Sequence, residues 1–193
     1  MNMGALVLAF HGCDKTIGEA ILAGKSEFKL SENSYDWLGS GIYFWENDEQ
    51  RAWEWAEQLA RRGKIKEAFA IGAVIDLGLC LDLNESASLD EVRASYDALK
   101  KLFDVTGLDL PQNKPGKKCS ADLLEQHLDC AVINNVHLLR EEAKRPAFDT
   151  VRSSFPEGES LYPGACIKER THTQLCVRAL GAIRGVFRLK RQL

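Results

Sequence analysis

The stretch that decides the fold is Ser34-Tyr-Asp-Trp-Leu-Gly-Ser-Gly-Ile-Tyr-Phe-Trp-Glu-Asn-Asp-Glu-Gln-Arg-Ala-Trp-Glu-Trp-Ala56. Gly39 and Gly41 permit a sharp turn or a close approach to a ligand, and the β-branched and aromatic run over 42–45 is typical of a strand. Asn47 and Gln50 form a capping-box pattern, which predicts that a helix begins there. The stretch therefore predicts a turn, a short strand and a helix in close succession, with a dense set of aromatic side chains.

The size and composition of the chain indicate one ordinary domain, residues 1–193. Its net charge of −3 gives no general attraction to nucleic acid or to an anionic membrane. The six cysteines contain no C-x-x-C pair, and no histidine or cysteine pair has metal-ligand spacing, so we expect a cytoplasmic protein without a metal site. The first apolar run lacks a basic segment and breaks off at His11, which predicts neither a signal peptide nor a membrane span.

The hydrophobic pattern on both sides of this stretch predicts an α+β domain. Ala5 to Phe10 is a continuous apolar run, typical of a buried strand, and it ends in His11-Gly12. The pattern further predicts helices over 14–24, 48–63, 88–103 and 120–144, strands over 67–83, 148–155, 174–180 and 182–189, and loops over 104–118 and 156–173.

Several polar residues receive a structural interpretation at this point. His127 and His137 belong to the helix predicted over 120–144, which we expect to be the longest, and we interpret both as structural. The last predicted strand is basic, and positive charge on an exposed edge strand discourages pairing with other chains. We therefore expect an edge strand that carries Arg184, Arg188, Lys190 and Arg191.

Three pieces of the chain together carry a family resemblance: the strand that ends in His11-Gly12, the run Gly39-Ser-Gly-Ile-Tyr-Phe44, and the late strand that begins at Gln174. Their order resembles the ADP-ribosyltransferase superfamily, in its diphtheria-toxin and poly(ADP-ribose) polymerase branch with the His-Tyr-Glu signature. The second motif matches without a gap, and a preceding Asp-aromatic-x-Gly pattern is similar to small bacterial toxin-like members. The resemblance implies two packed, mainly antiparallel sheets that form a central NAD cleft, with flanking helices.

The resemblance also implies roles for individual residues. His11 would hydrogen-bond the adenosine ribose of NAD, and the backbone of Gly12 would hold the nicotinamide carboxamide. Tyr43 would stack on the nicotinamide ring from one side, and an aromatic residue of the following helix would stack from the other. For that second aromatic we choose Trp55, with Trp53 as the alternative.

The chain departs from the family at Gln174, where the signature has a glutamate. That glutamate binds the ribose 2′-hydroxyl and stabilises the oxocarbenium-like transition state, whereas a neutral amide keeps only the hydrogen bond. Loss of one preorganised electrostatic contact typically slows a reaction by about 10²- to 10³-fold. A carboxylate of the preceding loop, Glu169 or alternatively Glu157 and Glu159, is a candidate to supply the missing charge, and in the family this loop recognises the target.

His172 lies two residues before Gln174, so both side chains point the same way on an extended strand. In transferases with a paired motif, the residue at this offset activates the acceptor. A histidine with a pKa near neutrality is suited to that role, and we therefore predict that His172 is a general base.

The resulting functional hypothesis is a mono-ADP-ribosyltransferase that uses NAD as co-substrate, with a protein or nucleic-acid acceptor. A role as a bacterial toxin or phage-defence effector, with an antitoxin partner, is compatible with a short free-standing member. The competing hypothesis is a degenerate module that binds NAD or ADP-ribose without consuming it. An RNA 2′-phosphotransferase on the same fold is disfavoured, because no matching set of arginines surrounds His11-Gly12.

Overall fold

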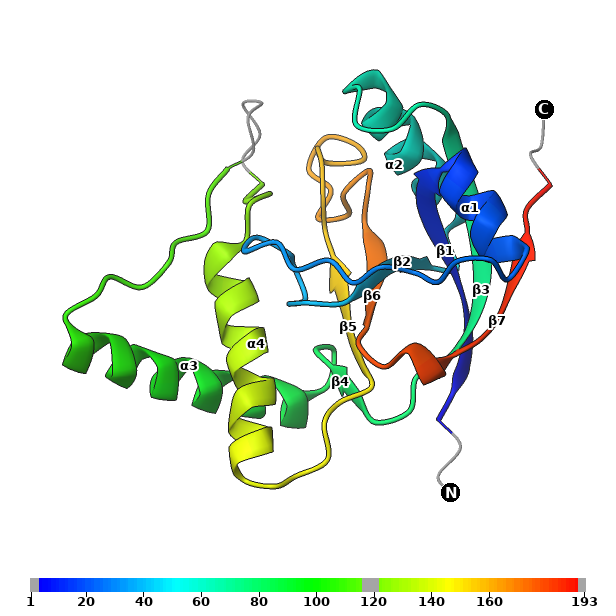
Figure 1. Ribbon diagram of the computed structural model, residues 1–193. Helices are drawn as coiled ribbons and strands as arrows, with labels where there is room; N and C mark the ends of the chain where they lie inside the picture. Colours follow the sequence, from blue (N-terminus) through cyan, green and yellow to red (C-terminus); the bar gives the residue numbers. More distant parts are fainter. Residues whose placement is uncertain (1–3, 116–121, 191–193) are drawn as a thin grey trace.

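The computed structural model of the chain describes residues 4–115 and 122–190. Within these ranges it contains seven strands and four helices, arranged as one mixed sheet with helices on its faces (Figure 1). The strand order across the sheet is β4-β5-β6-β2-β1-β3-β7. The strands are β1 (Leu6–Asp14), β2 (Ile42–Glu46), β3 (Ala68–Asp76), β4 (Cys80–Asp82), β5 (Thr150–Phe155), β6 (His172–Val177) and β7 (Ile183–Arg188), and the helices are α1 (Lys15–Leu22), α2 (Glu49–Arg61), α3 (Ser86–Thr106) and α4 (His127–Glu142).

The predicted α+β class is confirmed, but the strands form one continuous sheet in place of two packed sheets. Every strand pair is antiparallel except β4 with β5. The sheet has two wings, β4-β5-β6-β2 and β1-β3-β7, which are joined only by the pairing of β1 with β2. That pairing comprises Ala9 with Glu46 and Phe10 with Trp45, whereas β1 pairs with β3 over nine residues. The expectation of two packed sheets is therefore wrong, and the short β1–β2 pairing, the seam between the wings, makes all seven strands one sheet.

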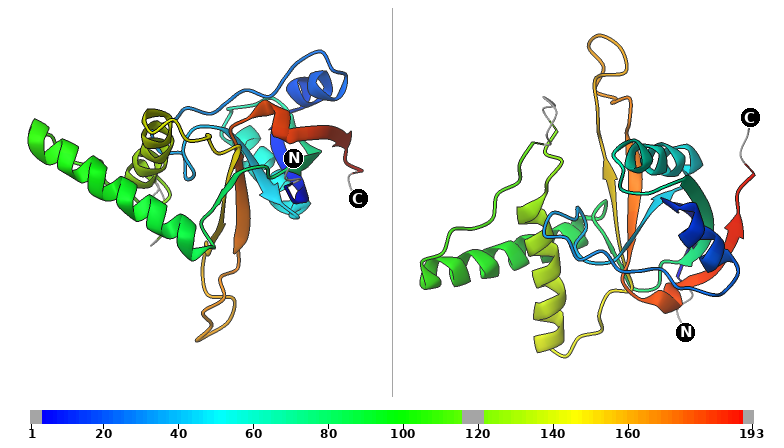
Figure 2. Two further views of the ribbon diagram at one scale, coloured as in Figure 1. Left: turned by 90° about the horizontal axis from the view of Figure 1, so that it is seen from below. Right: turned by 45° about the horizontal axis from the view of Figure 1, so that its top comes forward.

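Different helices cover the two faces of the sheet. Because paired residues on neighbouring strands share a face, the register assigns Phe10, Trp45 and Gln174 to one face. On that face α2 packs through Ala52 against Phe10 and Trp45, and α4 packs against the other wing. In both Figure 1 and Figure 2, β5 and β6 run between α4 and α2.

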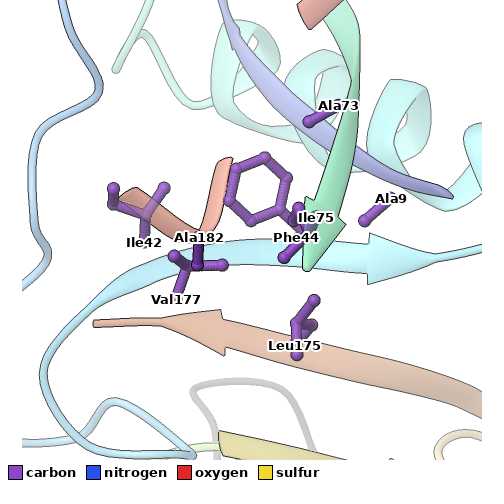
Figure 3. Packing of buried hydrophobic residues seen from close by; sticks show 8 residues of the cluster. All are labelled: Ala9, Ile42, Phe44, Ala73, Ile75, Leu175, Val177 and Ala182. Carbon is purple, nitrogen blue, oxygen red and sulfur yellow. The ribbon is translucent and has the colours of Figure 1, made fainter. Parts of the chain in front are cut away.

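The opposite face carries the main apolar cluster, which spans both wings (Figure 3). Near one end of this face α1 packs on β3 through Ile21, Phe69 and Ile71. Because the cluster includes β1, β2, β3 and β6, it holds the wings together where the seam between them is short. Its buried members are Ala9, Ile42, Phe44, Ala73, Ile75, Leu175, Val177 and Ala182.

The two glycines of the opening stretch serve packing and backbone geometry. Gly39 has φ of +74°, which L side chains rarely adopt, and a Cβ there would lie 2.7 Å from Asn134 Oδ1 on α4. A Cβ on Gly41 would lie 2.3 Å from Cys176 Sγ on β6. Ser40 N–H donates to Asn134 Oδ1 at 2.9 Å, which fixes the turn against α4. The glycine pattern therefore builds the turn that leads into β2.

Several predicted boundaries need correction. Asp48, and not Asn47, caps α2, because its Oδ1 accepts from Arg51 N–H at 3.0 Å while Asn47 has a positive φ of 54°. The helix expected over 120–144 is observed as α4, which begins at His127, and the expected start at Ser120 lies outside the described residues. The longest helix of the described ranges is α3, with 21 residues, and not α4, with 16.

The expected edge position of the basic last strand is confirmed, since β7 ends the strand order. Arg184 forms an ion pair with Asp76 at 2.9 Å, and Arg188 forms one with Glu19. Lys190 follows β7, and Arg191 lies outside the described residues. In the described ranges, no helix combines the length and the apolar character needed to cross a membrane.

His137 gives the fold a pH dependence that can be measured. Its side chain is buried on α4, neither ring nitrogen has a hydrogen-bond partner, and burial, with smaller contributions from Arg178 and Arg140, lowers its pKa to about 3. The unfolded chain therefore binds an extra proton between pH 6.5 and pH 3, so stability is lost as the pH falls through this window. We expect His137→Leu to remove about 3 kcal/mol of the stability that the protein loses between pH 7 and pH 4, as measured by urea unfolding at both pH values. Parallel pH profiles for the two proteins would contradict this assignment.

Gly12 is a position where α2 leaves no room for a side chain. A Cβ there would lie 2.3 Å from the Ala52 carbonyl oxygen, and backbone atoms cannot move aside without shifting the helix. We expect Gly12→Ala to lower the free energy of unfolding by about 1–3 kcal/mol. Gly185→Ala on β7 is the matched control, because no atom lies within 4 Å of its new Cβ. Equal effects of the two substitutions would show that α2 does not press on Gly12.

Candidate active site

One face of the sheet brings together most of the residues that the sequence singles out. Trp45 pairs with Gln174 and Tyr43 pairs with Cys176 across β2 and β6, while Phe10 pairs with Trp45 across β1 and β2. Since alternate residues of a strand share a face, Gly12 joins Phe10 on this face and His172 joins Gln174. The site face, defined by Gly12, Tyr43, Gln174 and His172, therefore lies on the side of the sheet that α2 and α4 cover.

Gly12 directs its backbone polar groups into the gap between the two wings. The bonds from Lys15 N–H to Glu67 O and from Leu77 N–H to Ala5 O show that odd-numbered residues of β1 bond to β3. Even-numbered residues therefore face β2, as the bond from Asn47 N–H to Leu8 O confirms. The β1–β2 register ends before Gly12. Its N–H and C=O thus point toward β2, two residues beyond Phe10, where the β1–β2 pairing ends.

His11 contacts β2 just beyond the last paired residues of β1 and β2. The Tyr43 carbonyl, which stands opposite Gly12 if the register is continued, accepts from His11 Nδ1 at 2.8 Å. Burial lowers the pKa of His11, so the ring is neutral near pH 7 and carries its proton on Nδ1. The ring packs edge-on against Phe28 and at a tilt against Phe44, on the face opposite to the site face. The structure therefore does not bring the His11 ring together with the side chains of the site face, and its contact with an adenosine ribose stays a prediction.

Tyr43 is held rigidly by the turn that precedes β2. Its hydroxyl donates to Gly39 O at 2.6 Å and accepts from Leu38 N–H at 2.8 Å. Burial raises the pKa of this hydroxyl far above its usual range, so it stays protonated. The aromatic ring therefore lies on the site face in a fixed orientation, as a stacking partner requires.

The two tryptophans of α2 have different surroundings. Trp55 is 39% exposed and its ring lies at a tilt against Trp45, with 6.0 Å between the ring centroids. Trp53 contacts Phe69 edge-on at 6.0 Å, packs against the cluster of Phe10, Trp45, Ala52 and Ala70, and donates from Nε1 to Glu49 at 3.3 Å. Trp45 belongs to the site face, so the arrangement favours Trp55 over Trp53 as the second stacking residue.

Gln174 is hydrogen-bonded to His172, its neighbour on the same face of β6. Gln174 Nε2 lies 3.2 Å from His172 Nε2, and His172 Nδ1 donates to Arg170 O at 2.7 Å. The His172 side chain is fully buried, with its ring stacked on Trp37. The general-base role of His172 stays a prediction that this geometry does not favour, because an acceptor could reach the ring only after a rearrangement.

The carboxylates of the loop between β5 and β6 differ in position. Glu157 is nearly buried, lies 3.9 Å from His172 Nδ1, and pairs with Arg51 at 3.1 Å and with Arg170 at 3.3 Å. Glu169 is half exposed and lies 3.9 Å from Arg170 Nε. Of the three candidate carboxylates, the structure therefore brings Glu157 closest to His172, but two arginines balance its charge.

Trp45 is a site residue that the sequence reasoning did not single out. It pairs directly with Gln174 across the strands, is 6% exposed, and its Nε1 is buried without a hydrogen-bond partner. Strand alternation was a usable signal, since Trp45 lies two residues after Tyr43 and so shares its face. No sequence signal pointed to Arg51, whose guanidinium connects α2 to Glu157.

Two cavities lie beside the site face and not within it. One of about 150 Å³ separates α3 from α4, and one of about 120 Å³ is lined by Trp37, Phe155 and Asp129 among others. Neither is lined by Gly12, Tyr43 or Gln174. Of the aromatic side chains of α2, Trp55 is the exposed one.

Comparison with known proteins adds one relative. The chain is 29% identical over 188 residues to an uncharacterized protein of Methanocaldococcus jannaschii, and the match covers 88% of this chain and 80% of that protein. No protein-family model matches the chain, and no solved structure matches it. Because that relative is itself uncharacterized, the similarity transfers no activity to this chain.

Proposed function

We propose that the protein is a mono-ADP-ribosyltransferase that uses NAD as co-substrate. The observation that carries the proposal is the backbone of Gly12, whose N–H and C=O face the gap between β1 and β2 without a recorded ladder pairing. A carboxamide offers one acceptor and one donor side by side, which complements this pair of groups. Nicotinamide would therefore bind by its carboxamide at the point where the two wings of the sheet separate.

The stacking residues lie where such a ring would need them. Tyr43 belongs to the same face as Gly12, and its hydroxyl is anchored by two hydrogen bonds. Trp55 is exposed on α2, the helix whose Ala52 packs on this face. The nicotinamide ring of NAD is cationic, so contact with aromatic faces favours it by roughly 0.5–2 kcal/mol.

The chemistry centres on the ribose. The glycosidic bond between C1′ and the nicotinamide nitrogen breaks, and its electron pair leaves with nicotinamide. A nucleophile of the acceptor forms the new bond to C1′ and releases its proton to water. Gln174 accepts a hydrogen bond from the 2′-hydroxyl through Oε1, which orients the ribose without adding negative charge. We therefore propose slow transfer of single ADP-ribose units, consistent with a toxin or defence effector that acts on a protein or nucleic-acid target.

A binding module is the second candidate, and a specific observation favours it. Gln174 is neutral, and Glu157, the carboxylate nearest to His172, is bound by Arg51 and Arg170. The site face thus offers little negative charge to an oxocarbenium ion. On this hypothesis the protein binds NAD or ADP-ribose and releases no nicotinamide.

Gln174→Glu separates these two candidates. The new carboxylate would stand where positive charge develops, so we expect nicotinamide release from NAD to rise by about 10²-fold. The measurement is nicotinamide release by the purified protein, and circular dichroism checks that the variant is folded. A second incubation, with labelled NAD and cell lysate followed by protease or nuclease, asks whether label is transferred and to which class of macromolecule. A folded variant that binds NAD and shows no gain would support the binding module.

Substitutions of the two tryptophans of α2 test which of them contacts NAD. We expect Trp55→Leu to weaken NAD binding about tenfold, because a stacking surface for the cationic ring is lost. Trp53→Leu should lower thermal stability through its lost contact with Phe69 but leave NAD affinity within about twofold. Isothermal titration with NAD measures both. The assignment of Trp55 is wrong if Trp53→Leu weakens binding more than Trp55→Leu does.

A further inference from the structure

The His172 ring is enclosed in a way that restricts its hydrogen bonds. Its side chain has no exposed surface, and it packs on Trp37 and Phe155 at 6.2 and 6.0 Å between ring centroids. Both ring nitrogens lie within hydrogen-bond distance of protein atoms. Nδ1 is close to the carbonyl oxygen of Arg170, and Nε2 is close to the side-chain amide of Gln174. No face of the ring is therefore left for a substrate.

The partner of each nitrogen fixes the tautomer. A backbone carbonyl can only accept, so Nδ1 must carry the proton that it donates to Arg170 O. Burial lowers the pKa of His172, which keeps the ring neutral near pH 7 and leaves Nε2 as a bare acceptor. The group that meets Nε2 must then be the donor end of the Gln174 amide.

We propose that His172 is a positioning residue, which holds the Gln174 side chain with its NH₂ toward the protein and its Oε1 toward the ligand. The proposal rests on the proposed function, in which Oε1 accepts from the 2′-hydroxyl of the NAD ribose. The two ends of an amide have nearly the same shape, so packing alone does not choose between them. The lone pair of His172 Nε2 selects the orientation of the Gln174 amide. If the amide were flipped, Gln174 Oε1 would face His172 Nε2, and both atoms are acceptors.

The charges around His172 act in both directions, and burial of the ring is the largest cause of its lowered pKa. Glu157 Oε2 lies 3.9 Å from Nδ1 and favours a protonated ring, as does Asp48 more weakly, while the Arg51 guanidinium opposes protonation. Arg170 contributes its carbonyl to Nδ1 and its guanidinium to Glu157. Protonation would turn Nε2 into a donor and reverse the amide, so we expect NAD affinity to be constant around neutral pH and to fall only at pH values below the usual range of a histidine pKa.

A double-mutant cycle tests the proposal through binding. His172→Phe preserves an aromatic ring between Trp37 and Phe155 but removes the acceptor. We expect it to weaken NAD binding about fivefold in a protein that keeps Gln174, because one hydrogen bond to the ligand is then misplaced. In the Gln174→Glu background the same substitution should cost no affinity, because both oxygens of a carboxylate are acceptors and need no orientation. Equal losses in the two backgrounds would overturn the proposal, since they would reflect damaged packing.

A spectroscopic readout tests the orientation without NAD. In nitrogen-15 NMR spectra, His172 should show a protonated Nδ1 and an unprotonated Nε2, with a coupling from the Gln174 amide across the hydrogen bond to Nε2. A protonated Nε2 at pH 7 would overturn the proposal. Failure of the unmodified protein to bind NAD would contradict the proposed function alone, and the NMR result would then decide whether His172 orients Gln174.

Discussion

The hydrogen bond from His11 Nδ1 to the Tyr43 carbonyl is the interaction on which the site depends. It joins β1 to the Tyr43 carbonyl at the position opposite Gly12, and the β1–β2 register ends after Phe10 and Trp45. The sheet consequently stays in one piece at the seam and opens beside it. The apolar cluster on the opposite face compensates for the lost ladder, because it packs side chains from both wings behind the opening. The apolar cluster therefore supports the sheet from behind at the place where the β1–β2 register ends.

The charged side chains near the site face neutralise one another, so no strong local charge remains there. Glu157 is shared between Arg51 and Arg170, and the two neighbouring side chains of β6, His172 and Gln174, are neutral. Such a site orients polar groups well but stabilises a developing cation poorly. This balance accounts for the two candidate functions, since recognition of NAD and consumption of NAD make different electrostatic demands on the same residues.

Prediction from the sequence succeeded where a single local pattern determines the structure. Hydrophobic periodicity placed the strands and helices, and strand alternation put His172 and Gln174 on one face. It failed where neighbours compete: Asp48 rather than Asn47 caps α2, and α4 begins at His127. It also expected His172 to meet an acceptor, which requires an accessible ring, whereas Trp37 and Phe155 enclose it. Those enclosing contacts join residues far apart in the chain, and no local pattern encodes them.

The attachment of the loop between β5 and β6 has an evolutionary consequence. Glu157 at its beginning and Arg170 at its end are tied to each other, and Glu157 is tied to Arg51 on α2. Beyond a bridge between Ser160 and Lys168 the loop exposes Leu161, Tyr162 and Ile167, and it extends past the ends of both strands (Figure 2). The ion pairs of Glu157 with Arg170 and Arg51 hold the base of the loop next to His172, and they do not involve the residues at the tip. The tip is thus a module that can diversify in length and composition while the site beneath it keeps its geometry.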